Sequence, residues 1–331
     1  MIEVVKSIDS KEWFEFSRKA NKVSFFQTED CFSFYKSLSF FDPFCFAVKE
    51  NNEFKGLILG YITKEKGLLK GFLSRRAIII GGPMLVEDIS DEALTLLLQS
   101  VSKSLKNKAI YIESRNFNDY SKYKEIFAKC GFVYNEHLNF HVDTSSVDIF
   151  QANMGKSRKR DVKTSIRDGA EVVYIPTIEQ IKEYYDILLD LYKTKVKTPL
   201  FDFEFFEKMH KCDWAKFILV KLNDEIIGGT VCVCLDGVGV YEWFACGRDG
   251  VYKNIYPSTL ATYSGIEYAV VNGYPLFDMM GAGKPTEDYG VRDFKSKFGG
   301  KLVEHGRFVK IQNSFLYWVG KTGVKFLKRK K

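Results

Sequence analysis

A nine-residue segment occurs twice in the chain, and this repeat constrains the fold more than any other feature. Residues 48–56 (VKENNEFKG) reappear as residues 220–228 (VKLNDEIIG), with the same residue at the Val, Lys, Glu and Gly positions and at the first Asn. Each copy has the composition of a polar hairpin turn between two apolar strands, where Asn, Asp and Gly are favoured. The repeat predicts two hairpins at equivalent places in a duplicated unit.

The segments that follow each copy agree with this interpretation, because they occur in the same order. After the first copy we predict strands at 57–62 and 77–80, a helix at 91–106 and a strand at 109–113. After the second we predict strands at 230–235 and 239–245, a helix at 258–272 and a strand at 275–279. The chain is therefore predicted to contain two α+β units. A length of 331 residues suits two domains, which we place at 1–147 and 148–331.

Composition limits the compartment and the chemistry. No stretch approaches the roughly 20 apolar residues of a spanning helix, and the N-terminus lacks the basic-then-apolar order of a signal peptide, so we expect a cytoplasmic protein. The seven cysteines are scattered, which favours reduced thiols over a disulfide framework. Cys232 and Cys234 alternate on a predicted strand without a second ligand pair, so we expect a buried structural role and no metal site.

The net charge of +7 is unevenly distributed. A predicted helix that starts near Gln151 carries Arg158, Arg160 and other cations, and residues 321–331 carry six cations interleaved with apolar residues. Such clusters attract phosphates, anionic lipid headgroups or nucleic acid. The alternative is a solvated helix face and a basic tail without a partner.

A glycine-rich segment near the end of the chain is the first candidate site. The apolar strand that ends at Asp278 leads into Gly281, Gly283 and Lys284, and then into residues 289–300 (YGVRDFKSKFGG). Glycine lets the backbone approach an anionic ligand closely, because it lacks a Cβ and tolerates positive φ. The alternative is a strand followed by two ordinary turns.

Familiar catalytic arrangements are missing from the sequence. There is no G-x-S-x-G elbow, no Walker-type lysine loop and no G-x-G-x-x-G fingerprint after a strand. His137 and His141 are four residues apart, but the extended segment expected there would separate them, so they do not predict a helical metal site. Acyl transfer to an amine is consistent with the absence of these motifs. The amine is already a nucleophile, so the enzyme mainly aligns it and stabilises the oxyanion.

These motifs resemble the Fem family of peptidyltransferases. The resemblance rests on the basic helix before Gly169, on the Phe277-Asp278 strand end with its glycines, and above all on residues 289–300. In the first half it rests on the duplicated architecture and on Gly81-Gly82-Pro83. The resemblance implies two tandem GNAT-like (acyl-CoA N-acyltransferase) domains of the α+β class, with mixed sheets flanked by helices.

The resemblance also implies a reaction, in which an aminoacyl group moves from aminoacyl-tRNA to an amino group of a muropeptide or lipid-linked cell-wall precursor. No cofactor is implied, because aminoacyl-tRNA is a co-substrate, and the basic tail is expected to face the membrane surface. The Phe294-Lys295 pair matches a Phe-Lys pair of the family, which makes Lys295 the candidate catalytic residue. The candidate substrate-binding residues are Phe294, Arg292, Tyr289, Lys284, Gly281, Gly283, Asp278, Tyr256, Trp243, Phe244, Arg158 and Arg160.

Two alternatives remain open. One is an N-acyltransferase that uses acyl-CoA or an acyl carrier protein on an amino sugar or lipid. Neither half contains the Gln/Arg-x-x-Gly-x-Gly/Ala loop that holds the pyrophosphate of acetyl-CoA, and this disfavours ordinary acetyl-CoA binding. The other is a non-catalytic protein that binds RNA or an anionic surface. The segment 192–211 is too short for the long helical arm that some Fem proteins carry, so this chain resembles the compact type.

Overall fold

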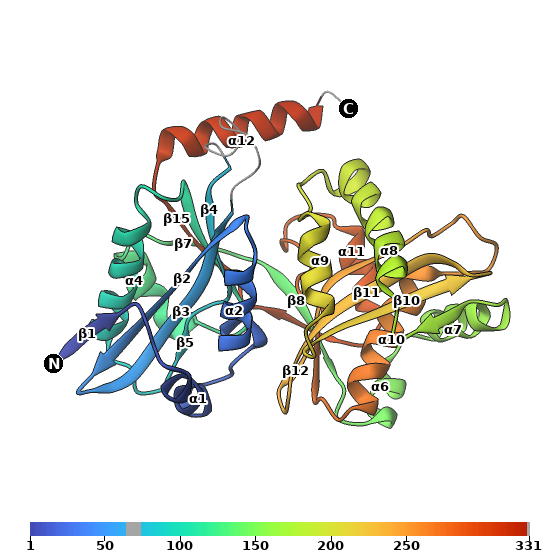
Figure 1. Ribbon diagram of the computed structural model, residues 1–331, viewed down its shortest axis with the longest axis horizontal. Helices are drawn as coiled ribbons and strands as arrows, with labels where there is room; N and C mark the ends of the chain where they lie inside the picture. The colour runs from blue at the N-terminus through green and yellow to red at the C-terminus, as the bar shows by residue number, and fades with distance from the viewer. Residues whose placement is uncertain (64–73, 330–331) are drawn as a thin grey trace. The chain divides into compact units, whose positions relative to one another are not determined.

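The computed structural model describes residues 1–63 and 74–329, and their side chains up to residue 322. Of the six cations predicted to form a basic tail at 321–331, the side chains of all but Lys321 lie outside the described residues. The described residues form two compact units, one of residues 1–136 and 304–331, the other of residues 137–303 (Figure 1). Each unit contains one large mixed sheet.

The first unit is built on an eight-stranded sheet, in the order β1-β2-β3-β4-β6-β15-β7 with the short β5 paired to β3. Its strands are β1 (Ile2–Val5), β2 (Phe41–Glu50), β3 (Glu53–Thr63), β4 (Arg76–Gly81), β5 (Met84–Leu85), β6 (Tyr111–Asn116), β7 (Val133–Asn135) and β15 (Arg307–Ile311). Its helices are α1 (Ser10–Lys19), α2 (Glu29–Ser37), α4 (Asp91–Leu105), α5 (Lys124–Lys129) and α12 (Ser314–Arg329).

The helix α4 shows why these sequences form these elements. Ser90 caps its N-terminus by accepting a hydrogen bond from the Ala93 backbone N–H at 3.1 Å. Asp91 and Glu92 lie in the first turn, where a negative charge favours the helix dipole. Its buried residues recur at helical spacing and pack on β1, β2 and β3. The predicted helix at 91–106 is thereby confirmed.

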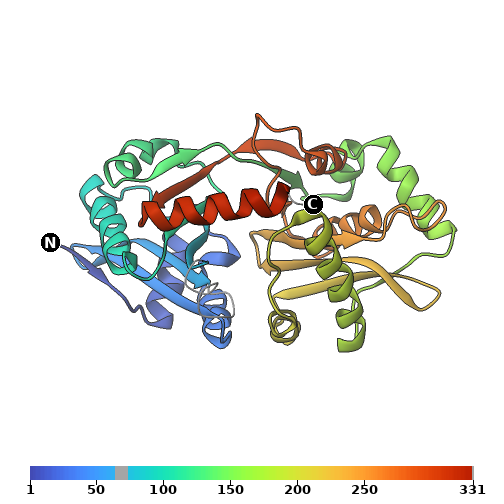
Figure 2. The same cartoon turned by 90° about the horizontal axis from the view of Figure 1, so that it is seen from above.

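The second unit is built on a seven-stranded sheet in the order β14-β8-β13-β12-β11-β10-β9. Its strands are β8 (Leu138–Asp143), β9 (Glu171–Val173), β10 (Ala215–Leu222), β11 (Glu225–Leu235), β12 (Gly239–Gly247), β13 (Leu276–Asp278) and β14 (Lys301–Glu304). Its helices are α6 (Val147–Asn153), α7 (Lys156–Arg167), α8 (Ile178–Leu191), α9 (Phe203–His210), α10 (Pro257–Val271) and α11 (Gly290–Ser296). The helices α8 and α10 pack on β11 and β12, and Figure 2 shows the same sheet from above.

The duplication is visible in the register of the strands. In the first unit the register of β2 and β3 shifts at a bulge directly after the pair Val48↔Gly56. In the second unit the register of β10 and β11 shifts directly after the pair Val220↔Gly228. The turn residues Asn51 and Asn52 have φ of 51° and 66°, and those at 223 and 224 have φ of 48° and 67°. The predicted equivalence of the two hairpins is therefore confirmed in sequence, register and backbone conformation.

The division between the units differs from the expected boundary at 147/148. The strand β8 precedes that boundary, yet it pairs antiparallel with β13 of the second unit. The strand β15 lies near the end of the chain, yet it pairs antiparallel with β6 and β7 of the first unit. Each sheet thus contains one strand from the other half of the sequence, β15 in the first unit and β8 in the second. These strands pair with residues more than 130 positions away along the chain, which local sequence patterns do not reveal.

Candidate functional site

The candidate site of the second unit begins where two parallel strands stop pairing. The strands β12 and β13 are registered at Val240↔Phe277 and Tyr241↔Asp278 only. Asp278 is buried there, and its carboxylate accepts hydrogen bonds from Asn139 Nδ2 at 2.7 Å and from the Met280 backbone N–H at 2.6 Å. The side chain at the end of β13 is thus buried and held in place by two hydrogen bonds.

Residues of β8 complete this carboxylate's surroundings. His141 Nε2 lies 3.1 Å from Asp278 Oδ2. Asn139 Oδ1 accepts from the backbone N–H groups of Phe140 at 2.8 Å and Gly281 at 2.7 Å, and this ties the glycine-rich turn to β8. Gly281 has a φ of 114°, a conformation that L residues rarely adopt, which explains the glycine at this position.

Lys295 reaches the same strand end from α11. Its ammonium donates hydrogen bonds to the carbonyl oxygens of Met279 and, at 2.9 Å, of Gly281. Burial lowers the pKa of Lys295, whereas the carboxylates of Glu242 and Asp278 act in the opposite direction. Two of its three donors contact described residues, so the group holds a fixed place and keeps one donor available.

Glu242 is a site residue that the sequence did not predict, as are Asn139 and His141. It is buried on β12, where its Oε1 accepts hydrogen bonds from the hydroxyl groups of Thr262 at 2.8 Å and Thr230 at 3.3 Å. Burial raises the pKa of this carboxyl group, and the charge of Lys295 opposes that shift. Its signal in the sequence is a single acidic residue within an apolar strand, GVYEWFACG.

The two arginines that the sequence grouped together have different surroundings. The Arg158 side chain is 12% exposed, and its Nη1 donates to Asp161 at 3.3 Å and Thr259 at 3.1 Å. Its guanidinium lies 4.5 Å from the ring centre of Phe294. The Arg160 side chain is 76% exposed. Arg158 therefore belongs to the packing of α7, α10 and α11, whereas Arg160 faces solvent.

The loop before α11 is organised by Arg292. Its Nη2 donates to the carbonyl oxygen of Lys284 at 3.0 Å and to that of Glu287, and its Nη1 donates to that of Pro285 at 3.3 Å. A Cβ on Gly283 would lie 2.8 Å from the ring of Tyr289. These contacts make Arg292, Gly283 and Tyr289 the residues that shape the loop, and Lys284 remains exposed.

The Phe298-Gly299-Gly300 motif has a packing explanation. A Cβ on Gly299 would lie 2.4 Å from the Asn153 carbonyl oxygen, and one on Gly300 would lie 3.2 Å from the His141 carbonyl oxygen. These two glycines allow the chain to approach itself. The sequence interpretation, in which they let the backbone approach a ligand, does not describe the contacts seen here.

The aromatic candidates separate into two places. Phe244 is buried against Phe205 and Phe206 of α9, and the Trp243 ring lies 5.2 Å from that of Phe205. A register shift places Trp243 at a bulge in β12, because Val231 pairs with Phe244 and Cys232 pairs with Glu242. Tyr256 lies elsewhere, before α10, where its backbone N–H donates to Ser165 Oγ at 2.9 Å.

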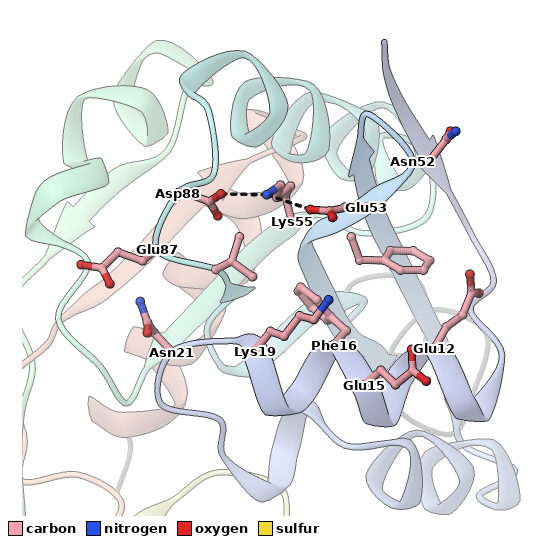
Figure 3. A pocket seen from close by; sticks show the side chains of 12 residues that line it. Glu12, Glu15, Phe16, Lys19, Asn21, Asn52, Glu53, Lys55, Glu87 and Asp88 are labelled. Carbon is pink, nitrogen blue, oxygen red and sulfur yellow. Dashed lines mark hydrogen bonds and ion pairs between the residues drawn. The ribbon is translucent and has the colours of Figure 1, made fainter.

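The first unit contains two open hollows, of about 480 and 380 Å³. The larger lies between α1, the β2–β3 hairpin and the segment after β5, and five carboxylates line it together with Lys19 and Lys55 (Figure 3). Lys55 Nζ is 2.8 Å from Asp88 and 3.3 Å from Glu53. None of the residues predicted for the site lines either hollow.

No group of three or more His, Cys, Asp or Glu residues within 1–63 and 74–329 could hold a metal ion. None of the described helices is both long and apolar enough to cross a membrane. Cys232 and Cys234 are buried, as their alternation on the strand predicted.

Solved structures define the class of the fold. The chain resembles the crystal structure of FemX at 17% identity, with a TM-score of 0.70 over 96% of this chain and 99% of that one. It resembles a tandem GNAT protein from the clavulanic acid biosynthesis pathway at 8% identity, with a TM-score of 0.60 over 95% and 99% of the two chains. The predicted α+β fold with tandem GNAT-like units is thereby confirmed.

A sequence comparison finds a family match for part of the chain. The profile of the FemAB family matches residues 209–325, a segment that contains Glu242, Asp278 and Lys295. The resemblance to the Fem family is confirmed for this segment. None of the curated proteins matches the sequence. A further structural relative is the C-terminal domain of a putative lysylphosphatidylglycerol synthetase from Agrobacterium fabrum, at 15% identity, with a TM-score of 0.54 over 81% of this chain and 84% of that one.

Proposed function

We propose that the protein is an acyltransferase that moves an aminoacyl group from aminoacyl-tRNA to an amino group of a peptidoglycan precursor. The FemAB profile over 209–325 and the tandem GNAT-like fold support acyl transfer in general. The observation that carries the proposal is the ammonium of Lys295, which is held by the carbonyl oxygens of Met279 and Gly281 just after the end of β13, where the charges of Glu242 and Asp278 favour its protonated form.

The proposed reaction requires mainly that the enzyme align the amine with the ester and stabilise the negative charge that develops on the carbonyl oxygen. The acceptor nitrogen forms a bond to the ester carbonyl carbon, the ester C–O bond breaks, and the proton lost by the amine ends on the ribose oxygen that leaves. After the new C–N bond forms and before the C–O bond breaks, the carbonyl oxygen carries negative charge. The remaining donor of Lys295 stabilises that charge, and the two backbone carbonyls that it contacts keep the ammonium in place.

The donor and the acceptor can be tested together. The purified protein is incubated with tRNA charged with radiolabelled amino acids and with a nucleotide-linked muropeptide, and label on the muropeptide is counted. Transfer that disappears when the tRNA is uncharged supports the proposal. Transfer from acyl-CoA to an amino sugar or lipid, without transfer from tRNA, would assign the protein to the N-acyltransferase alternative.

We also propose a peripheral contact of α12 with the inner membrane surface. Phe315 and Trp318 are 71% and 63% exposed, and they lie one turn apart on this helix. The sequence from Ser314 to the end contains six cations and no acidic residue, which suits an anionic leaflet. Exchanging Phe315 and Trp318 together for Ser should abolish sedimentation with phosphatidylglycerol vesicles, and unchanged sedimentation would disprove the contact.

A further inference from the structure

The helix α11, which carries Lys295, is too short to hold its position alone. It has seven residues, and isolated helices shorter than about 12–15 residues are only marginally stable in water. None of these seven residues, all of which the structure describes, is fully buried. The carbonyl oxygens of Met279 and Gly281 fix the ammonium end of the Lys295 side chain. Its backbone end depends on what packs against α11.

The turn after α11 is joined to the segment between α6 and α7. The backbone N–H of Gly155 donates to the carbonyl oxygen of Lys297 at 2.9 Å. A Cβ on Gly155 would lie 3.0 Å from that oxygen, and a Cβ on Gly299 would lie 2.4 Å from the carbonyl oxygen of Asn153. The two glycines therefore permit a close backbone contact that places the end of α11 beside the start of α7.

Arg158 of α7 makes the side-chain contact with α11. Its guanidinium carbon lies 4.5 Å from the ring centre of Phe294 and 5.6 Å from that of Phe298. The two ring centres are 5.3 Å apart, and Phe298 belongs to the hydrophobic core of this unit. The negative faces of aromatic rings attract a guanidinium, and the attraction is stronger where water is excluded, as at this side chain, which is 12% exposed.

The same guanidinium is tied to α10. Its Nη1 donates to Thr259 Oγ1 at 3.1 Å and to Asp161 Oδ2 at 3.3 Å, and both of these residues are buried. The helix α10 packs on β11 and β12. Arg158 thus connects α11, and with it Lys295, to a helix that lies against the central strands of the sheet.

These contacts distinguish Arg158 from a cation that binds a substrate phosphate. A phosphate contact requires guanidinium donors that solvent can reach. The side chain of Arg160, two residues further along α7, is 76% exposed and meets this requirement. The Arg158 guanidinium instead lies between the ring of Phe294 and the hydroxyl of Thr259.

We propose that Arg158 is a positioning residue for Lys295. By holding the ring of Phe294 against α7, it fixes the place from which α11 extends the adjacent lysine. The inference rests on the function proposed above for Lys295. A displacement of about 1 Å in a catalytic arrangement can cost up to about 10²-fold in rate, so the loss of Arg158 should lower turnover while substrates still bind.

The first test measures the position of α11 without any reaction. Arg158→Met removes the charge and keeps the apolar stem. Amide hydrogen exchange of the full-length protein, followed by mass spectrometry, should become severalfold faster across residues 290–298. Lys163→Met is the matched control, because it removes the same charge from an exposed position of α7 and should leave this exchange unchanged. Unchanged exchange in Arg158→Met would disprove the positioning role.

The second test is a double-mutant cycle on the transfer from charged tRNA to the muropeptide. Arg158→Met should lower kcat about tenfold, per folded molecule, and leave KM for both substrates nearly unchanged. In the Lys295→Met background the same change should have no further effect, because a residue that acts through Lys295 then has nothing to position. An equal loss in both backgrounds, or a change in KM alone, would overturn the proposal.

A conservative variant covers the case in which Arg158→Met does not fold. Arg158→Lys keeps a cation that can reach the ring of Phe294 but lacks the planar group, so its kcat should lie between those of the wild type and Arg158→Met. A kcat of Arg158→Lys equal to that of the wild type would show that the guanidinium contacts are not needed.

The tests separate failure of this proposal from failure of the proposed function. If the wild type transfers no label, the proposed function is wrong, and hydrogen exchange at 290–298 still decides whether Arg158 holds α11. If transfer depends on Lys295 but Arg158→Met lowers it equally in both backgrounds, the function stands and the positioning role of Arg158 is wrong.

Discussion

The two units share a backbone plan but differ in the charges placed on it. Both have the same bulged hairpin, and both pair an antiparallel strand from the other half of the chain beside a parallel strand pair. At the end of that pair one unit gathers Asp278, Glu242 and Lys295, and the other gathers Glu113, Arg115 and Arg307, with 3.4 Å from Glu113 to Arg115 and 2.6 Å from Glu113 to Arg307. The comparison shows a buried carboxyl group at the same register position in both units, Asp278 and Glu113, with different neighbours: Asn139 contacts Asp278, and Arg307 contacts Glu113.

The largest expected effect concerns Lys295. If the reaction takes place in the second unit, Lys295→Met keeps the apolar stem, removes the charge, and should lower turnover by about 10²–10³-fold, as the loss of one oxyanion contact does. The variant also leaves the carbonyl oxygens of Met279 and Gly281 without this donor, so its melting temperature should fall, and turnover is compared per folded molecule. The transfer assay with charged tRNA measures the effect.

Lys297→Met is the matched control, because Lys297 is two residues away and exposed. It should be much milder. Near wild-type turnover in Lys295→Met with loss in Lys297→Met would show that the wrong lysine was assigned. If neither variant loses turnover, the electrostatic mechanism is wrong for this unit.

The next effect concerns Glu113. Burial opposes its charge, but Arg115 and Arg307 outweigh burial and lower its pKa in the folded protein to about 2, below the ordinary value of 4.5. It therefore adds stability above pH 4.5 that is lost as the pH falls toward 2. Glu113→Gln should therefore lower the free energy of unfolding by about 3 kcal/mol at pH 7, and by less at pH 3. Urea unfolding at both values measures the difference.

The exposed Glu125 provides the control for this experiment. Glu125→Gln should leave the free energy of unfolding nearly unchanged at both pH values. A difference between wild type and Glu113→Gln that is as large at pH 3 as at pH 7 would contradict the ion-pair explanation.

At Glu242 we expect a smaller effect on the free energy of unfolding, with the opposite dependence on pH. Its pKa is raised in the folded protein, so its contribution to stability is complete below its unfolded pKa and is lost as the pH rises through the folded pKa. Glu242→Gln keeps an oxygen for Thr262 and Thr230, and should become more stable relative to wild type between pH 5 and pH 8. A relative loss of stability over this range would show that the carboxylate is stabilised as an anion.

The smallest effect tests the equivalence of the hairpins directly. Asn52 and Asp224 have φ of 66° and 67°, where a residue with a Cβ is strained. Asn52→Ala and Asp224→Ala should each cost about 1 kcal/mol of unfolding free energy. The glycine variants at the same positions should cost little, and clearly unequal alanine costs would argue that the two turns are not equivalent.

The sequence predicted what depends on local pattern. The repeat located both hairpins, because Asn and Asp accept positive φ and the flanking residues alternate as strands do. The predicted helices at 91–106 and 258–272 correspond to α4 and α10 within one residue at each end. The Phe-Lys match predicted Lys295 as a site residue, and in the structure its ammonium contacts the carbonyl oxygens of Met279 and Gly281, just after Asp278.

What the sequence could not show depends on pairing between distant residues. Nothing local to Leu138–Asp143 indicates that this strand joins the sheet of Phe277, so Asn139 and His141 were not recognised as neighbours of Asp278. The sequence did not predict Glu242 as a site residue. A strand is predicted from its apolar residues, and a single acidic residue among them forms no motif that would indicate a site. The glycines at 299 and 300 were assigned to a ligand because sequence alone does not show which backbone they approach.

The strand order has a consequence for biosynthesis. The strand β15 lies between β6 and β7, and it belongs to a segment made after residue 300. While the ribosome is still translating the second unit, the sheet of the first unit lacks an internal strand, and the edges of β6 and β7 stay unpaired. The first part of the protein to be translated is therefore among the last to finish folding, and a nascent chain must keep these edges from pairing with others until β15 emerges.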